Sequence, residues 1–134
     1  MGVVVFDSDV LIGFLNRDDA HHQAAVDWMR EAMAAGTRRL LCAVNYAEIL
    51  IGPLRVGAQE RVKQMVTQFS IETVAVDGAL AERAAAVRAR TNLKLPDAFA
   101  LATAIHAEHR GLTDVRLASF DESVLKAYAA INAR

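Results

Sequence analysis

The chain has 134 residues, 54% of them hydrophobic, and a formal net charge of -1 at pH 7. This length and composition predict one domain, over residues 1–134, that buries a core without disulfide bonds. The near-neutral charge excludes the strongly basic class of nucleic-acid-binding protein, so any such contact has to come from local patches. The single cysteine, Cys42, fits a protein of the reducing cytoplasm. Because neither a signal peptide nor an apolar run of roughly 20 residues is visible, we expect no membrane contact.

The first element that we expect is a buried strand that ends at an acidic residue. Residues 3–6 form an unbroken apolar run, as in a parallel sheet that helices cover on both faces. Asp7 follows at the carboxyl end of this strand, where open α/β sheets place their ligand crevice. Ser8 and Asp9 come next, and either can cap the helix that follows by accepting hydrogen bonds from its first free amides. Asp7 is therefore a candidate metal ligand.

The rest of the chain alternates predicted helices with short apolar strands. Strands that are separated by helices predict βαβ units with right-handed crossovers. We therefore expect an α/β fold, a three-layer αβα sandwich around a parallel sheet of at least four short strands. The predicted helices span residues 10–15, 20–35, 45–53, 58–69, 77–92, 96–109 and 121–130, and the later predicted strands span residues 39–43, 71–76 and 115–118.

Three further acidic residues occupy positions from which they could join Asp7. Glu48 lies one turn into the helix after the second strand, and Asp121 follows the fourth strand. Because the carboxyl ends of parallel strands meet at one edge of a sheet, we expect Asp7, Glu48 and Asp121 to open onto one crevice. Asp97 lies in the first turn of a helix that begins at Pro96, and it joins them only if that end of the helix points to the same place.

Four carboxylates in one crevice favour the binding of a divalent cation. Clustered negative charges repel one another, and a cation removes this penalty because it supplies the opposite charge. The candidate ligands are all oxygen atoms, and no Cys and His residues have the spacing of a zinc site. The ligand chemistry therefore favours Mg²⁺ or Mn²⁺ over Zn²⁺.

Two of the acids have an ordinary helix-capping or helix-dipole explanation. Asn45 and Glu48 have the spacing of a capping box, in which Glu48 would only reach back to the amide of Asn45. Asp97 is favoured in a first helical turn by the helix dipole, whatever its function. Neither residue taken alone therefore identifies a metal site.

The other two acids differ in how easily a structural role explains them. Asp121 could cap the last helix, and Asp114 competes with it as the fourth acid, although Asp114 precedes its strand. Asp7 is the hardest to explain, because two polar residues after it are available to cap the next helix. The joint pattern is more informative than any one of these acids.

Four blocks of sequence, spread over nearly the whole chain, carry a resemblance to a known family. They are residues 5–12 (VFDSDVLI), 44–52 (VNYAEILIG), 95–104 (LPDAFALATA) and 117–121 (LASFD). In their order and spacing they resemble the PIN-domain ribonucleases, and within that family the VapC-type toxins of bacterial toxin-antitoxin modules. The resemblance implies a PIN-like sandwich with a sheet of four to five strands, although residues 128–134 are too short and alanine-rich to show the fifth.

The resemblance also implies roles for individual residues. It makes Asp7, Glu48, Asp97 and Asp121 the catalytic residues and the ligands of Mg²⁺ or Mn²⁺. We hypothesise that Asp7, Asp97 and Asp121 position the metal, while Glu48 orients the attacking water or holds a second ion. Groups that support these ligands without binding the metal are the next set. They are Ser8, Asp9 and Ser119.

The activity that the resemblance implies is endoribonuclease cleavage by a water that the metal activates. That water attacks phosphorus in line and leaves a 5′-phosphate and a 3′-hydroxyl. The resemblance implies a type II toxin that inhibits translation or growth, forms a homodimer and binds a cognate antitoxin. The apolar residues 10–15 and 46–54 are candidates for the groove that receives the antitoxin.

Basic residues near the predicted acids are candidates for contacts with RNA phosphates, with solvated helix surface as the alternative role. These candidates are Arg17, Arg88, Arg90 and Lys94. The histidine pairs at residues 21–22 and at residues 106 and 109 have no third ligand, so we expect them to have surface or capping roles. The aromatic residues Trp28, Tyr46 and Phe99 lie on apolar helix faces, where we expect core packing rather than base stacking.

Two other functions fit parts of the sequence. Residues 6–10 also resemble the nucleophile motif of haloacid-dehalogenase-type phosphatases, in which Asp7 would be phosphorylated and Asp9 would act as the acid. That family needs a later Ser or Thr after a strand, a Lys and a paired acidic motif, whereas Ser119 and Asp121 lie too close together and in the wrong order of elements. The third possibility is a catalytically silent module that binds a partner protein.

Overall fold

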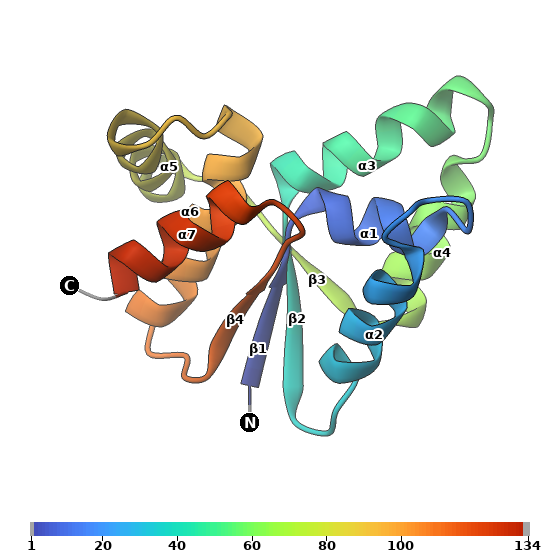
Figure 1. Cartoon of the computed structure of the whole chain (residues 1–134), viewed down its shortest axis with the longest axis horizontal. Coiled ribbons are helices and arrows are strands. Elements are labelled where there is room, and N and C mark those ends of the chain that lie inside the picture. Colours follow the sequence, from blue (N-terminus) through green and yellow to red (C-terminus); the bar gives the residue numbers. More distant parts are fainter. Residues whose placement is uncertain (1, 133–134) are drawn as a thin grey trace.

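The computed structural model describes residues 2–132 and has a four-stranded parallel sheet at its centre (Figure 1). The order of the strands across the sheet is β3-β2-β1-β4. This arrangement confirms the predicted αβα fold with a parallel sheet. The strands are β1 (Gly2–Phe6), β2 (Thr37–Cys42), β3 (Ile71–Val74) and β4 (Val115–Ala118).

The order of the strands changes sides at β1, because β2 and β3 lie on one side of it and β4 lies on the other. On one side β1 pairs with β2, and on the other it pairs with β4 in a register that places Phe6 opposite Ala118. The ladder continues one step further, because the amide of Asp7 donates a 2.8 Å hydrogen bond to the carbonyl oxygen of Ala118. Asp7 therefore lies at the switch point of the sheet, where ligand crevices form in open α/β folds.

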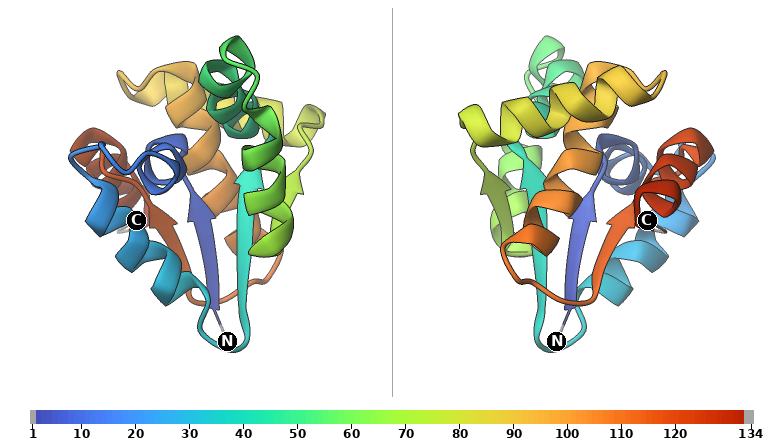
Figure 2. Two further views of the ribbon diagram at one scale, coloured as in Figure 1. Left: turned by 90° about the vertical axis from the view of Figure 1, so that its right-hand side faces the viewer. Right: turned by 90° about the vertical axis from the view of Figure 1, so that its left-hand side faces the viewer.

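Helices cover both faces of the sheet, as Figure 2 shows from its two sides. The apolar run in β1 divides between the two layers: Val3 and Val5 belong to the core with α5, α6 and α7, whereas Val4 and Phe6 belong to the core with α1 to α4. The unbroken apolar sequence is thus explained by burial on both faces. The helices are α1 (Ser8–Leu15), α2 (His22–Ala32), α3 (Ala43–Arg55), α4 (Gln59–Gln68), α5 (Gly78–Arg90), α6 (Leu95–His109) and α7 (Glu122–Asn132).

Several element boundaries differ from the sequence prediction for local reasons. Helix α3 begins at Ala43 rather than at Asn45, so Asn45 lies inside the helix and is fully buried. Helix α2 begins only at His22, because the carboxylate of Asp19 accepts a hydrogen bond from the amide of His21 and holds the preceding turn. Strand β3 ends at Val74, two residues earlier than predicted.

The fifth strand that the sequence left open is absent from the described part of the chain. Helix α7 continues to Asn132, so residues 128–132 are helical, and the rest of that prediction, residues 133–134, lies outside the described residues. The sheet described over residues 2–132 therefore has four strands. No helix in this range is both long and apolar enough to cross a membrane.

Candidate functional site

Asp7 lies at the end of β1 with only 1% of its surface exposed. Its Oδ1 accepts a 2.9 Å hydrogen bond from the amide of Ser8, and its Oδ2 accepts one of 2.8 Å from the hydroxyl of Ser119. Burial, and next the negative charge of Asp9, raises the pKa of Asp7 to about 7, while the bond from Ser119 opposes the rise. A carboxyl group with this pKa gives up its proton readily when a positive charge comes close.

The cap of α1 is Asp7 itself, so the prediction that Ser8 or Asp9 would cap this helix is wrong. Both residues lie inside α1, and their side chains point to other partners. The hydroxyl of Ser8 donates a 2.9 Å hydrogen bond to Oε1 of Glu48. Ser8 therefore joins the ends of two different strands, since Glu48 follows β2.

Glu48 is held by a residue whose role the sequence did not reveal. The side-chain amide of Asn45 donates hydrogen bonds of 3.1 Å to Oε1 of Glu48 and 3.1 Å to the carbonyl oxygen of Pro96. The capping-box explanation of Glu48 is wrong, because Asn45 lies within α3 and bonds through its side chain. Asn45 instead connects α3 to the first turn of α6, which carries Asp97. The one sequence feature that pointed to Asn45 was its position three residues before Glu48, and a capping box explains that spacing equally well.

Asp97 lies in the first turn of α6, and that end of the helix points to the same crevice. Burial raises the pKa of Asp97, and the negative charges of Asp121 and Glu48 raise it further, whereas the positive charge of Lys94 lowers it. The negative charge of Asp9 raises it as well, so acids from three other segments act on this one carboxyl group. The sequence analysis required this end of the helix to point towards the other acids, and in the structure it does.

Asp121 contacts the start of the last helix and also a residue that bonds to Asp7. Its Oδ1 accepts a 2.8 Å hydrogen bond from the amide of Ser123 at the start of α7, and its own amide donates one of 3.1 Å to the hydroxyl of Ser119. Ser119 therefore links Asp121 to Asp7. The competing acid, Asp114, lies at the opposite edge of the sheet, where its carbonyl oxygen accepts a hydrogen bond from the amide of Val3.

Asp9 faces the same group of acids from inside α1. Its Oδ2 accepts a 3.0 Å hydrogen bond from the amide of Phe120, and its buried Oδ1 has no hydrogen-bond partner among residues 2–132. Burial is the main cause of its raised pKa, and the bond from Phe120 opposes the shift. An unpaired buried carboxylate oxygen is costly unless a donor or a cation reaches it.

The oxygen ligands of this site fit a hard divalent cation, although in this structure the acids do not converge on one point. Within residues 2–132, no three His, Cys, Asp or Glu side chains lie close enough together to hold one ion. The ligands on offer are carboxylate oxygens, which suit Mg²⁺ or Mn²⁺. Binding one ion would require the partly exposed side chains of Glu48, Asp97 and Asp121 to turn towards buried Asp7.

The predicted RNA-binding residues are exposed, and they differ in their distance from the acids. Lys94 lies three residues before Asp97, and its charge lowers the pKa of that carboxyl group. Arg88 instead donates a 3.4 Å hydrogen bond to the carbonyl oxygen of Thr91 at the end of α5. Within residues 2–132, no hydrogen bond or ion pair connects Arg17, Arg88 or Arg90 to the four acids, so only Lys94 is placed beside them.

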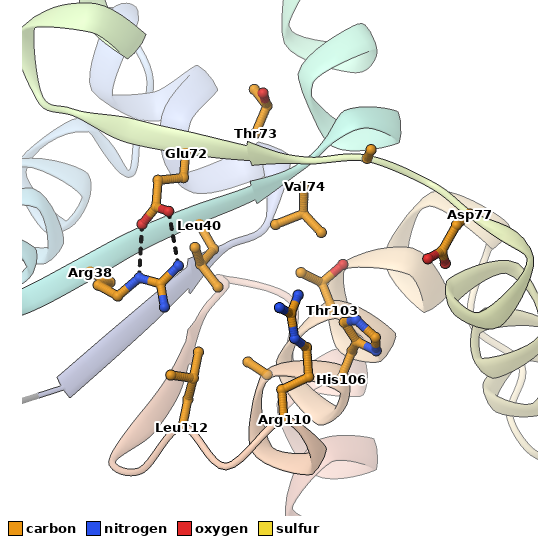
Figure 3. A pocket seen from close by; sticks show the side chains of 12 residues that line it. Arg38, Leu40, Glu72, Thr73, Val74, Asp77, Thr103, His106, Arg110 and Leu112 are labelled. Carbon is orange, nitrogen blue, oxygen red and sulfur yellow. Dashed lines mark hydrogen bonds and ion pairs between the residues drawn. The ribbon is translucent and has the colours of Figure 1, made fainter.

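A cavity of about 400 Å³ lies away from the acids, between β2, β3 and the last turns of α6 (Figure 3). His106 from α6 and Arg110, which directly follows this helix, project into it beside the ion pair of Arg38 and Glu72. That pair has two hydrogen bonds, of 3.0 Å and 2.9 Å. None of the four acids lines this cavity, so it is separate from the crevice at the carboxyl end of the sheet.

Comparison with known proteins identifies similarities over almost the whole chain. The model of the PIN domain family matches residues 4–131. A chain of a toxin-antitoxin complex from Klebsiella pneumoniae has a TM-score of 0.62 at 23% identity, with 90% of this chain and 87% of that chain covered. VapC20 of Mycobacterium tuberculosis, a sarcin-ricin loop cleaving toxin, has a TM-score of 0.65 at 15% identity, with 97% and 95% covered.

A third solved structure has the same fold. It is a chain of VapBC2 from Rickettsia felis bound to a DNA fragment of its promoter, with a TM-score of 0.61 at 10% identity and 89% of this chain and 99% of that chain covered. At these identities the likeness to solved structures establishes the fold alone. Comparison with curated proteins gives no match.

Proposed function

This chain belongs to the PIN domain family, and on that basis we propose that it is a metal-dependent endoribonuclease and the toxin of a type II toxin-antitoxin module. The observation that carries the proposal is the group of four acids at the carboxyl end of the sheet, assembled around Asp7, which is 1% exposed. Two of the similar structures support it, since one is a toxin-antitoxin complex and another is a sarcin-ricin loop cleaving toxin.

The reaction we propose is hydrolysis of an RNA phosphodiester. Water forms a new bond to phosphorus, the bond from phosphorus to the 3′-oxygen breaks, and the products carry a 5′-phosphate and a 3′-hydroxyl. A divalent cation, Mg²⁺ or Mn²⁺, would supply the positive charge that lowers the pKa of water and stabilises the charge on phosphate. Asp7, Asp97 and Asp121 would hold that cation, and Glu48 would orient the attacking water.

The supporting residues position these acids. Ser119 bonds to the Asp7 carboxylate and accepts a bond from the amide of Asp121, so it sets the spacing between those two acids. Ser8 and Asn45 both donate to Oε1 of Glu48. Such groups determine which way a ligand oxygen points, and their loss weakens metal sites without removing a ligand.

The partner we propose is a cognate antitoxin that binds an apolar groove of about 380 Å³ between α1 and the α3–α4 corner. Ile12 from α1 and Pro53 and Val56 from the end of α3 line this groove, and 79% of Val56 is exposed. Exposed apolar side chains of this kind suit an apolar segment of a partner. The groove uses both stretches, residues 10–15 and 46–54, that the sequence singled out. As in VapC-type toxins, we expect the protein to form a homodimer.

The phosphatase alternative has less support. The PIN domain model matches residues 4–131, and the later Ser or Thr, the Lys and the paired acidic motif that the phosphatase family needs are not found in the required order of elements. Phosphoenzyme trapping with beryllofluoride would revive this alternative. A silent binding module would be favoured by tight partner binding without cleavage of any RNA in Mg²⁺ or Mn²⁺.

The test of the proposed function compares the acid of α6 with an acid outside the crevice. We expect purified protein to cleave total RNA in Mg²⁺ or Mn²⁺ and to stop in EDTA, with 5′-phosphate ends on the products. Asp97→Asn should abolish cleavage, whereas Asp114→Asn should leave it unchanged because Asp114 lies at the other edge of the sheet. Cleavage by Asp97→Asn at the wild-type rate would overturn the assignment. In cells, induction should arrest growth, and a DNA-binding antitoxin encoded next to the gene should relieve the arrest.

A further inference from the structure

An aromatic stack lies at the rim of the acidic crevice. The ring centroids of His21 and Phe120 are 4.7 Å apart with an interplanar angle of 21°, and His21 is exposed. The two residues come from opposite ends of the chain, the α1–α2 turn and the β4–α7 loop. The sequence suggested only a surface or capping role for His21, because Phe120 is remote from it along the chain.

Contacts with α1 hold Phe120, and backbone hydrogen bonds hold His21. The amide of Phe120 donates a hydrogen bond to Oδ2 of Asp9, and its ring packs on α1, where a Cβ on Gly13 would be in ordinary van der Waals contact with its Cε2 at 3.6 Å. The backbone of His21 is fixed as well, because its amide donates a 2.8 Å hydrogen bond to Asp19 and its carbonyl oxygen accepts one of 2.9 Å from Ala25. Phe120 stacks on the imidazole, and His21 nevertheless remains exposed to solvent.

The position of the stack relates it to the proposed reaction. Phe120 stands between Ser119 and Asp121, so the stack begins one residue from a proposed metal ligand. Burial is the main cause of the raised pKa of Asp9, and the charge of His21 is among the effects that oppose it, so the imidazole lies within electrostatic reach of the acids. Lys94 acts on Asp97 from the α5–α6 side of the sheet. Lys94 and the stack of His21 on Phe120 are therefore both placed beside the acids.

We propose that His21, supported by Phe120, is a positioning residue that stacks on one nucleobase of single-stranded RNA beside the phosphodiester to be cut. This inference rests on the proposed ribonuclease function and deepens it. Aromatic rings bind unpaired bases because every base offers a π face, and a ring that is already ordered loses little entropy on binding. The stacked base fixes the strand so that the neighbouring phosphate lies over the acids.

The test measures binding separately from cleavage. A fluorescent single-stranded RNA is titrated with protein in EDTA, which prevents cleavage, and each nucleotide is replaced in turn by an abasic residue. With wild-type protein, one abasic position should weaken binding by roughly 5- to 100-fold. His21→Ala should weaken binding of the intact RNA by a similar factor and should no longer respond to that abasic position. His21→Phe should retain both the affinity and the response.

Two controls separate stacking from a loss of structure. His109→Ala removes an exposed histidine at the far end of α6 and should bind like the wild type. The unfolding temperature of His21→Ala should also match the wild type, because the hydrogen bonds of residue 21 come from its backbone. A lower unfolding temperature with equal losses on every RNA would mean a structural role and would overturn the proposal.

The remaining outcomes are equally decisive. The platform is refuted if His21→Ala binds all RNAs like the wild type, or if His21→Phe is as weak as His21→Ala, since the latter result would indicate a contact by charge. Lack of any RNA binding by the wild-type protein would also refute it. If the abasic pattern appears but Mg²⁺ or Mn²⁺ produces no cleavage, the proposed ribonuclease function fails and the stacking platform stands.

Discussion

The two ends of α6 differ in how their charges are compensated. At its first turn, burial is the main cause of the raised pKa of Asp97, and the negative charges of Asp121 and Glu48 raise it further. At its last turns lies the cavity where Arg38 and Glu72 neutralise each other through two hydrogen bonds. Paired charges stabilise a surface locally, whereas uncompensated like charges cost stability and are typical of functional sites. The contrast supports the proposal that a cation binds at the first-turn end.

The largest expected effect comes from removing the charge at the centre of the acidic end. Asp7→Asn should lower the rate of RNA cleavage by more than about 100-fold, since loss of a ligand should exceed the 10- to 100-fold effect of losing a supporting group. Glu72→Gln changes a residue of β3 beside the last turns of α6, and it should leave the rate of RNA cleavage unchanged. Initial rates on labelled RNA in Mn²⁺ measure both. Equal losses in the two variants would remove the distinction between the ends.

The same Asp7→Asn variant should be more stable than the wild type in EDTA at pH 8. The pKa of Asp7 is raised from 3.8 to about 7 in the folded protein, so its contribution to stability is complete below pH 3.8 and is lost as the pH rises through 7. The neutral amide avoids that loss, and we expect a gain of roughly 2 to 4 kcal/mol at pH 8. Urea unfolding at pH 8 and pH 4 measures it, and an equal gain at both pH values would exclude the charge as the cause.

A divalent cation should stabilise the folded protein, because its positive charge offsets the repulsion among the negative charges at the acidic end. Saturating Mn²⁺ should raise the unfolding temperature of the wild type by roughly 5 °C or more, because an ion that binds only the folded state stabilises it. Asp97→Asn should lose most of this increase, while Asp114→Asn should keep it. A thermal shift that is the same in all three proteins would point to a site elsewhere.

Asn45 should affect catalysis by holding the acidic end together. Asn45→Ala removes the bonds to Glu48 and to the carbonyl oxygen of Pro96, and cleavage should fall by roughly 10- to 100-fold. The matched control is Asn92→Ala, which changes an exposed asparagine just before α6. Cleavage rates at saturating RNA compare the two variants, and an unchanged rate in Asn45→Ala would mean that Glu48 needs no such support.

The smallest effect should come from the paired charges at the other end. Arg38 and Glu72 are both about half exposed, with side-chain exposures of 51% and 48%. A double-mutant cycle with Arg38→Gln and Glu72→Gln should therefore give a coupling of about 0.5 kcal/mol in urea unfolding. The pair lowers the pKa of Glu72, so the coupling should disappear as acid protonates this group. A coupling that persists in acid would not be electrostatic.

Much of the fold and of the acid group followed from the sequence, because the signals are local. The unbroken apolar run before Asp7 predicted a strand that is buried on both faces, and the four predicted strands with their helices led to the parallel sheet. The edge shared by parallel strand ends then predicted that Asp7, Glu48 and Asp121 open onto one crevice. Helix boundaries were less accurate, because a cap such as Asp7 is chosen by three-dimensional contacts as well as by residue type.

Only the tertiary structure decided what depends on contacts between distant segments. It brought the first turn of α6 to the acids, which the sequence left as a condition on Asp97. It turned Asn45 from a helix cap into a link between α3 and α6, and it stacked His21 on Phe120 from the other end of the chain. The physical reason is that hydrophobic periodicity and capping report on neighbours along one element. Which elements meet at the end of a sheet depends on how the whole core packs.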